Sequence, residues 1–185
     1  ARPKQWIKNI LVFASPLLAF ECDFDTLLFC LYAFLSFCLV SSGIYFLNDA
    51  LDVKKDRLHP IKKNRPIASG IISKKRAILC SILLIFSGFL LTLTFIHELF
   101  LILSTYCLIQ IFYCLYLKDK PLVDIFCISS GFLLRALAGG VKDNVYLSPW
   151  FILTVGLLAL FLAIEKRKAE LRYILNGGMI TRIVL

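Results

Sequence analysis

Charge is scarce in this sequence, and so are the residue patterns that hold metals through sulfur. Charged residues make up 18% of the chain and hydrophobic residues 59%, against roughly 25% and 45–50% in an ordinary soluble domain. The seven cysteines include no CxxC pair, which argues against a cysteine metal site or a disulfide framework. His59 and His97 stand alone, and neither is expected to bind a metal. This composition favours a membrane protein.

The N-terminus also lacks the mark of a cleaved signal peptide. Basic residues precede an apolar run, but no small-residue cleavage site follows and Pro16 interrupts the run. We therefore expect this segment to be retained as a first helix. The only methionine is Met179, so we also expect the chain to be a fragment.

Long apolar runs are abundant, and they set the fold class. A helix needs about 20 mostly apolar residues to cross a bilayer, and several uncharged stretches have about that length. These stretches are residues 26–47, 77–96, 99–117 and 147–164. Two weaker candidates are residues 10–20, which form a short run, and 122–141, which contain Asp124 and Arg135. Because lipid offers the backbone no hydrogen-bond partners, we predict an all-α transmembrane bundle of about six spans, without strands.

The basic residues alternate between the loops of these six spans. All of them except Arg135 and Lys142 fall before the first span, in the second and fourth loops, or after the sixth span. Acidic residues dominate the opposite loops. The positive-inside rule then places both termini and every basic loop in the cytoplasm, with the chain in the plasma (cell inner) membrane.

A charged segment, NDALDVKKDRLHPIKKNRPIASG at residues 48–70, follows the second apolar run. Asp49, Asp52 and Asp56 are spaced i, i+3 and i+7, so a helix continuing out of the span would carry them on one face beside Asn48. Clustered carboxylates of this kind suit Mg²⁺ or Mn²⁺. The cations that follow can neutralise phosphate oxygens and a leaving diphosphate. These cations are Arg57, Lys62, Lys63 and Arg65.

This segment has two other interpretations. A basic loop beside a membrane can serve only to attract anionic lipid, at about 1 kcal/mol per charge. That reading accounts for the lysines but leaves the three spaced aspartates unexplained. A calcium loop needs a DxDxDG spacing, which is absent.

Arg135 is an ionisable residue inside a span. Gly131, Arg135 and Gly139 recur at i, i+4 and i+8, so the arginine shares a face with glycines that permit close helix contact. An ionisable residue at such depth usually faces the protein interior and serves a function. The alternative is an internal ion pair, for which Asp124 is the candidate partner.

The string N-D-x-x-D-x-x-x-D beginning at Asn48 resembles the first aspartate-rich motif of the UbiA superfamily of intramembrane prenyltransferases. Within that superfamily the chain resembles most the decaprenyl-phosphate phosphoribosyltransferases. The similar segments are RPKQWIKN, NDALDVKKDRLHPIKKNRPIASG, YCLYLKDKPLVDIFCISSGFLLRALAGG and EKRKAEL, in that order. The resemblance implies a helical bundle around a cavity that opens sideways to lipid. It also implies roughly nine spans of about 20 residues, so that residues 1–185 would be a single membrane domain forming the N-terminal two thirds of a longer protein.

The activity that the resemblance implies is a Mg²⁺-dependent transfer of 5-phosphoribosyl from phosphoribosyl diphosphate to a polyprenyl phosphate. Asp49, Asp52 and Asp56 would hold the metal. Typical superfamily members carry a second DxxxD motif after span six, where this chain has Lys166 and Glu170. Three successive cations in this loop suit an additional phosphate better than a second metal. The residues expected to bind substrate are Lys8, Asn48, Arg57, Lys62, Arg65, Lys118, Arg135, Lys166, Arg167 and Glu170.

Two other functions remain open at the level of sequence. One is prenyl transfer from a polyprenyl diphosphate to an aromatic acceptor, which the first motif would serve equally well. The other is a non-catalytic membrane transporter or scaffold whose basic loops hold anionic lipid. The expected partners are the lipid bilayer, a polyprenyl phosphate and phosphoribosyl diphosphate, and no nucleic acid is expected.

Overall fold

The computed structural model of the protein describes residues 3–118, 120–142 and 147–175, and this part of the chain is helical without a strand. The elements in chain order are η1 (Pro3–Phe13), α1 (Ala14–Ala19), α2 (Phe24–Leu51), α3 (Val53–Leu58), η2 (Lys62–Asn64), α4 (Lys74–Phe95), η3 (His97–Leu99), α5 (Phe100–Phe112), η4 (Tyr113–Leu117), α6 (Pro121–Ala138) and α7 (Pro149–Leu175). The all-α prediction is confirmed.

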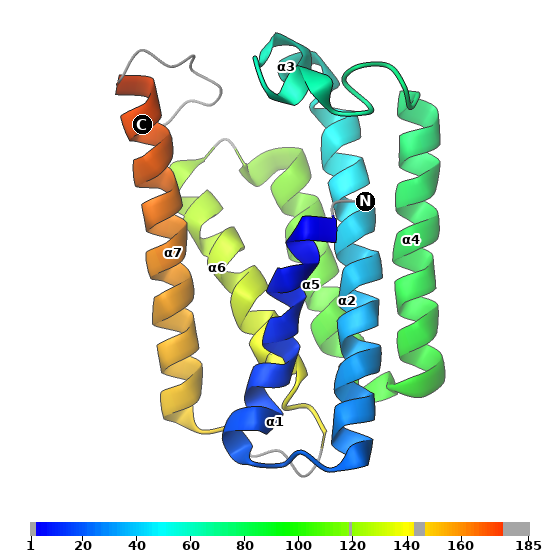
Figure 1. Cartoon of the computed structure of the whole chain (residues 1–185), viewed down its shortest axis with the longest axis vertical. Coiled ribbons are helices and arrows are strands. Elements are labelled where there is room, and N and C mark those ends of the chain that lie inside the picture. Colours follow the sequence, from blue (N-terminus) through cyan, green and yellow to red (C-terminus); the bar gives the residue numbers. More distant parts are fainter. Residues whose placement is uncertain (1–2, 119, 143–146, 176–185) are drawn as a thin grey trace.

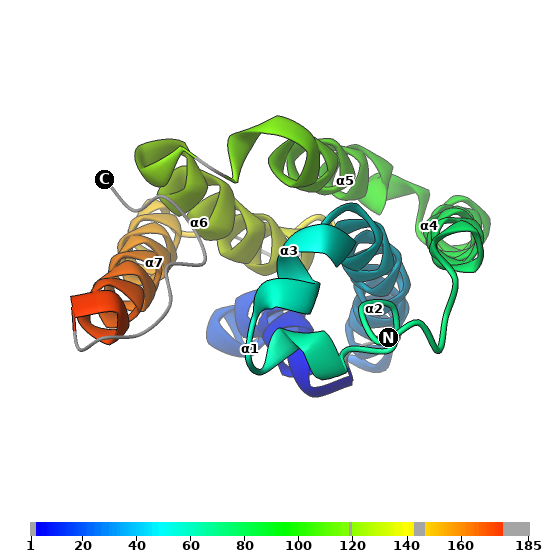
Figure 2. The same cartoon turned by 90° about the horizontal axis from the view of Figure 1, so that it is seen from above.

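The long helices run side by side as one bundle (Figure 1). Seen from above, α4, α5, α6 and α7 form a curved row, and α2 and the N-terminal segment lie on one side of it (Figure 2). α2 packs extensively against α4, while α6 packs against both α5 and α7. The buried core lies where η1, α2 and α5 meet, around Val12, Phe37, Leu99, Leu103 and Tyr106.

Four helices of the described chain are long and apolar enough to cross a membrane. They are Phe24–Leu51, Lys74–Phe95, His97–Leu117 and Pro149–Ala169. The sequence predicts about six spans, whereas four of the described helices meet this criterion of length and apolar composition. The N-terminal segment is helical along the bundle, but it is divided into the 3₁₀ helix η1 and the short α1. The other weaker candidate is α6, which contains Asp124 and Arg135.

Side-chain burial agrees with a bundle surrounded by lipid. In α2, 61% of the most apolar window is buried, whereas the figures for α4 and α7 are 17% and 11%. The outward residues of α4 are large and apolar, among them Leu79, Phe86 and Leu93. α2 is therefore the central helix of the bundle, and α4 and α7 present their apolar sides outward.

The ends of the helices are set by ordinary capping. Asp23 precedes α2 and its carboxylate accepts the backbone N–H of Thr26, while the Ser73 hydroxyl does the same for Arg76 at the start of α4. Figure 1 shows that α3, the α5–α6 connection and the last turns of α7 all lie at one end of the bundle. The sequence predicted that the loops carrying most of the cations share one side, and the fold agrees.

Glycines allow the closest helix contacts. Gly43 on α2 and Gly88 on α4 each face the partner helix at a distance that leaves no room for a Cβ atom. Gly139 follows α6, and a Cβ there would collide with the backbone carbonyl oxygen of Val12 in η1. The N-terminal segment therefore depends on Gly139 to lie against α6.

We expect Gly139→Ala to destabilise the protein by about 1–3 kcal/mol, because the overlap is with backbone and no side-chain rotation relieves it. Thermal melting of the purified protein in detergent would measure the effect. Gly156→Ala on α7 is the matched control, since nothing lies within 4 Å of the position of its Cβ. The control should melt at or above the wild-type temperature, because alanine favours a helix over glycine by about 1 kcal/mol. Equal melting of the two variants would contradict this account of the contact.

Candidate functional site

The aspartate motif lies at the end of α2 and in α3. α2 ends at Leu51, the chain bends at Asp52, and α3 begins at Val53. The three aspartates therefore do not lie on one unbroken helix, as the sequence predicted, but on two helices joined at Asp52. The bend is slight, because Asp52 still donates its N–H to the Asn48 carbonyl at 3.0 Å and accepts from Asp56 N–H at 2.8 Å.

Arg65 joins two of the three carboxylates. Its Nη1 atom lies 3.1 Å from Asp49 Oδ1 and 2.6 Å from Asp56 Oδ2. Both carboxylates are largely buried, with 12% and 6% of their side chains exposed, while 25% of Arg65 is exposed. The structure thus brings Asp49, Asp56 and Arg65 together, as the sequence predicted for one site.

The segment after α3 folds back to deliver Arg65. His59 Nδ1 accepts the backbone N–H groups of Ile61 and Lys62, at 3.1 and 3.3 Å, and so closes the turn. Burial, followed by the nearby charge of Lys62, lowers the pKa of His59 and favours the neutral ring that this role requires. Arg57 Nε donates to the Ala68 carbonyl at 3.0 Å. Arg57 was expected to bind phosphate, but its Nε atom holds this loop.

Lys118 reaches the third carboxylate from a distant part of the chain. Its Nζ atom lies 2.5 Å from Asp52 Oδ1, and only 9% of the lysine side chain is exposed. Lys118 directly follows η4, the π-helical turn that continues from the end of α5. The α5–α6 connection therefore contributes to the same cluster as the aspartate motif, as the charge alternation predicted.

Sequence reasoning missed a buried polar network beside Lys118. Tyr113 donates its hydroxyl to Asp124 Oδ1 at 2.6 Å. Arg167 donates to Asp124 Oδ2 from Nε at 2.5 Å and also from Nη2. Asp124 is fully buried and Arg167 is 7% exposed. Asp124 thus pairs with Arg167 on α7, and the sequence alternative of an Asp124–Arg135 pair is wrong.

Arg135 makes a different set of contacts deeper in the bundle. Its Nε donates to Asn9 Oδ1 at 2.6 Å, its Nη2 to the Tyr106 hydroxyl at 2.7 Å, and its Nη1 to the Gly131 carbonyl. The guanidinium also lies 4.6 Å from the centre of the Tyr106 ring. All three of its nitrogen atoms donate within the protein, and none of these contacts involves the aspartate cluster.

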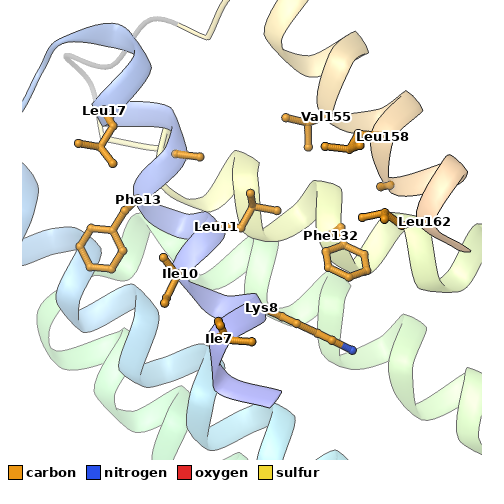
Figure 3. Close-up of a pocket in the computed structure, with 12 residues that line it drawn as sticks. Ile7, Lys8, Ile10, Leu11, Phe13, Leu17, Phe132, Val155, Leu158 and Leu162 are labelled. Carbon is orange, nitrogen blue, oxygen red and sulfur yellow. The ribbon is translucent and has the colours of Figure 1, made fainter. Parts of the chain in front are cut away.

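An apolar groove of about 430 Å³ lies between the N-terminal segment, α6 and α7. Figure 3 shows Leu17 and Phe13 toward one end of it and Lys8 at the other. Lys8 Nζ lies 5.8 Å from the centre of the Phe132 ring. Of the described residues that line the groove, Lys8 alone carries a charge.

The segment at residues 165–170 is not a loop, as the sequence suggested, but part of α7. Lys168 Nζ lies 2.8 Å from Glu165 Oε1, a pair at i, i+3 that favours a continuing helix. Successive helical residues point about 100° apart, so the three cations there do not face one substrate. Arg167 points inward to Asp124, whereas Lys166 and Lys168 are exposed. The side chain of Glu170 lies outside the described structure.

The UbiA prenyltransferase family model matches residues 9–173. The chain belongs to this family. A decaprenyl-phosphate phosphoribosyltransferase of Mycolicibacterium smegmatis is 43% identical over 176 residues, which are 92% of this chain and 55% of that protein. The enzyme of the same description from Mycobacterium tuberculosis is 37% identical over 186 residues, which are 98% of this chain and 62% of that protein. The chain thus spans about half to three fifths of the length of these relatives.

A solved structure of a UbiA homologue from Archaeoglobus fulgidus bound to DMAPP and Mg²⁺ has the same fold. It superposes with a TM-score of 0.78 at 21% sequence identity, over 95% of this chain and 63% of that one. The UbiA fold predicted from the sequence motifs is confirmed.

The UbiA family implies a divalent metal, and the oxygen atoms at the end of α2 fit one that is shared with a phosphate. Asn48 Oδ1 is buried and has no hydrogen-bond partner. Within the described residues, however, no three His, Cys, Asp or Glu side chains converge as a metal-holding group. Mg²⁺ usually needs only one or two carboxylates, and it completes its shell with waters and substrate phosphates. The donor set therefore suits a Mg²⁺ diphosphate better than a metal enclosed by protein alone.

Proposed function

We propose that the complete protein transfers 5-phosphoribosyl from phosphoribosyl diphosphate to a polyprenyl phosphate of the decaprenyl type, with Mg²⁺, and releases diphosphate. The observation that carries the proposal is the interleaving of Asp49, Asp52 and Asp56 with Arg65 and Lys118 at one end of the bundle. A metal diphosphate also carries both signs of charge, so the cluster complements it. The names of the relatives at 37–43% identity support a ribosyl donor.

The side chains of the cluster have separate roles in this reaction. Asp49 and Asp52 would hold the metal, together with Asn48. Asp56, which shares Arg65 with Asp49, would stand close enough to join them. When bound, Mg²⁺ neutralises the diphosphate and makes it a better leaving group. Arg65 and Lys118 exchange their carboxylate partners for diphosphate oxygens and stabilise the charge that develops there. Lys62 and Lys166 are further candidates for phosphate contacts.

The bond changes require little proton transfer. An oxygen of the lipid phosphate bonds to the anomeric carbon of the ribose, and the bond from that carbon to the diphosphate breaks. A phosphate monoester has a second pKa of about 6 and is largely ionised at neutral pH. The acceptor is therefore a competent nucleophile without a general base from the protein.

The apolar groove beside Lys8 supports a lipid acceptor. The described residues of its lining are apolar except for Lys8, whose ammonium lies at one end (Figure 3). An isoprenoid chain would bury its hydrocarbon along the groove, and the lysine would attract the lipid phosphate. The alternation of basic loops supports a cytoplasmic site in the plasma membrane, on the side where a water-soluble donor is available.

Prenyl transfer to an aromatic acceptor is the second candidate. The solved UbiA homologue bound to DMAPP and Mg²⁺ favours it at the level of fold, and a prenyl diphosphate also suits the charge cluster and the groove. A non-catalytic role as a transporter or scaffold would leave the three aspartates dispensable and the protein insensitive to Mg²⁺ and diphosphate.

Membranes that contain the full-length protein should convert labelled phosphoribosyl diphosphate and polyprenyl phosphate to a lipid-linked product, and chelation of Mg²⁺ should stop the conversion. Thin-layer separation of the labelled lipid would measure it. Supplying labelled prenyl diphosphate and an aromatic acceptor to the same membranes separates the two transferase candidates. Consumption of the prenyl donor alone would refute the phosphoribosyl proposal, and consumption of neither donor would favour the scaffold.

A further inference from the structure

The turn that precedes Lys118 is not α-helical. α5 ends at Phe112, and Tyr113–Leu117 form a π-helical turn. The Lys118 N–H donates to the Tyr113 carbonyl, five residues back, at 3.2 Å. An additional residue in one turn rotates the following side chain by about 100° relative to an uninterrupted α-helix. The direction of Lys118 toward Asp52 therefore depends on this turn.

Tyr113 is fixed at its other end by the buried network. Its hydroxyl donates to Asp124 in the first turn of α6, and Asp124 accepts two donors from Arg167 on α7. π-helical turns are uncommon and occur frequently at functional sites. Here the hydrogen bond to Asp124 holds the first residue of the turn in place.

A continuous set of contacts links the Asp124–Arg167 pair to Asp52 of the aspartate motif. Arg167 and Tyr113 both donate to Asp124, the Tyr113 carbonyl accepts the Lys118 N–H, and Lys118 Nζ contacts Asp52. In the first part, Asp124 and Arg167 are buried and Tyr113 is partly buried, and the three residues come from α6, α7 and η4. The contact between Lys118 and Asp52 belongs to the candidate diphosphate site.

We infer that Tyr113, Asp124 and Arg167 form a bracket that positions Lys118, and that the bracket sets the affinity for diphosphate without touching it. Asp124 and Arg167 are positioning residues, so Arg167 serves the site through Lys118 and does not bind a phosphate directly as the sequence suggested. The inference rests on the proposed function only in that a diphosphate binds beside Asp52, whether it is attached to ribose or to a prenyl chain.

A double-mutant cycle with the full-length protein in detergent tests this inference. The readout is the thermal stabilisation by Mg²⁺ with inorganic diphosphate, titrated to give an apparent affinity, since a ligand that binds only the folded state raises its melting temperature. Tyr113→Phe and Asp124→Asn are each introduced into the wild-type protein and into Lys118→Ala. Tyr116→Phe is the matched control, because Tyr116 lies in the same turn and is 69% exposed.

In the wild-type background, Tyr113→Phe and Asp124→Asn should each weaken the apparent affinity by about 5-fold or more, whereas in the Lys118→Ala background they should change it by less than about 2-fold. Tyr116→Phe should have no effect in either background. The melting temperature without ligand reports general destabilisation separately. If Asp124→Asn does not fold, the milder Tyr113→Phe decides the question.

Equal losses of affinity in both backgrounds would overturn the inference, because the bracket would then act independently of Lys118. It would also be overturned if Tyr113→Phe left the affinity unchanged, or if the wild-type protein were not stabilised by Mg²⁺ with diphosphate. Because inorganic diphosphate is the probe, a failure of phosphoribosyl transfer would refute the proposed function and leave this result standing.

Discussion

Asp49→Asn is expected to lower the rate of phosphoribosyl transfer on the order of 100-fold or more, because charge stabilisation at the diphosphate is usually a large part of catalysis. The substitution keeps the shape of the side chain and removes its charge. Arg65 then keeps Asp56 as its anionic partner, so the fold should persist. The measurement is the initial rate of labelled lipid formation in membranes with equal amounts of protein.

Asp25→Asn is the matched control for Asp49→Asn. Asp25 lies in the first turn of the same helix, α2, at the opposite end from Asp49, and it is exposed. It should keep wild-type activity. Undiminished transfer by Asp49→Asn would remove the metal role of the motif, and equal losses in the two variants would indicate a general effect of charge on the membrane.

Arg135→Ala is expected to cost about 3 kcal/mol or more of stability, because each buried polar group that loses its partner costs about 1–3 kcal/mol. The substitution leaves Asn9 Oδ1, the Tyr106 hydroxyl and the Gly131 carbonyl without the donor that they share. These groups belong to η1, α5 and α6, so the loss loosens three elements at once. Thermal melting in detergent would measure it.

The affinity for Mg²⁺ with diphosphate in the fraction of Arg135→Ala that stays folded should remain near the wild-type value. Arg76→Ala is the control, since Arg76 is exposed at the start of α4. A variant at position 135 that melts normally but loses diphosphate binding would place the arginine in the substrate site, as the sequence had suggested, and not in the structural core.

Much of the bundle follows from the distribution of apolar and charged residues. Uncharged runs of about 20 residues predict membrane helices, and the alternation of cations between loops predicts which connections share an end. From these two patterns the sequence predicts that Lys118 lies at the same end as Asp52, and the structure places the two in contact.

The sequence does not predict the bend at Asp52, the π-helical turn at Tyr113 or the helical conformation of residues 165–170. The spacing of the aspartates cannot reveal the bend at Asp52, since the backbone remains nearly helical there. The π-helical turn at Tyr113 depends on an anchor in another helix, and no local pattern predicts it. The segment at residues 165–170 resembled a loop because it is charged, but it has no glycine or proline and so continues α7.

The choice of partner for Arg135 and Asp124 also lay beyond the sequence. The two residues are in the same helix, and their charges made an internal pair plausible. In the bundle Asp124 lies in the first turn of α6 and meets α7, whereas Arg135 lies in the last turn and meets η1 and α5. Ion pairing here follows from which helices are neighbours, and that arrangement depends on the packing of the whole chain.

The contacts of Arg65 and Lys118 make the binding of a metal ion and the binding of a diphosphate at the candidate site depend on each other. Each cation already has a carboxylate partner, so a metal ion alone would have to displace a protein cation, and a diphosphate alone would have to displace a protein carboxylate. When both bind together, the displaced protein cations pair with diphosphate oxygens and the displaced carboxylates pair with the metal ion. The two ligands should therefore favour each other's binding reciprocally. Neither Mg²⁺ alone nor diphosphate alone should bind tightly to the site.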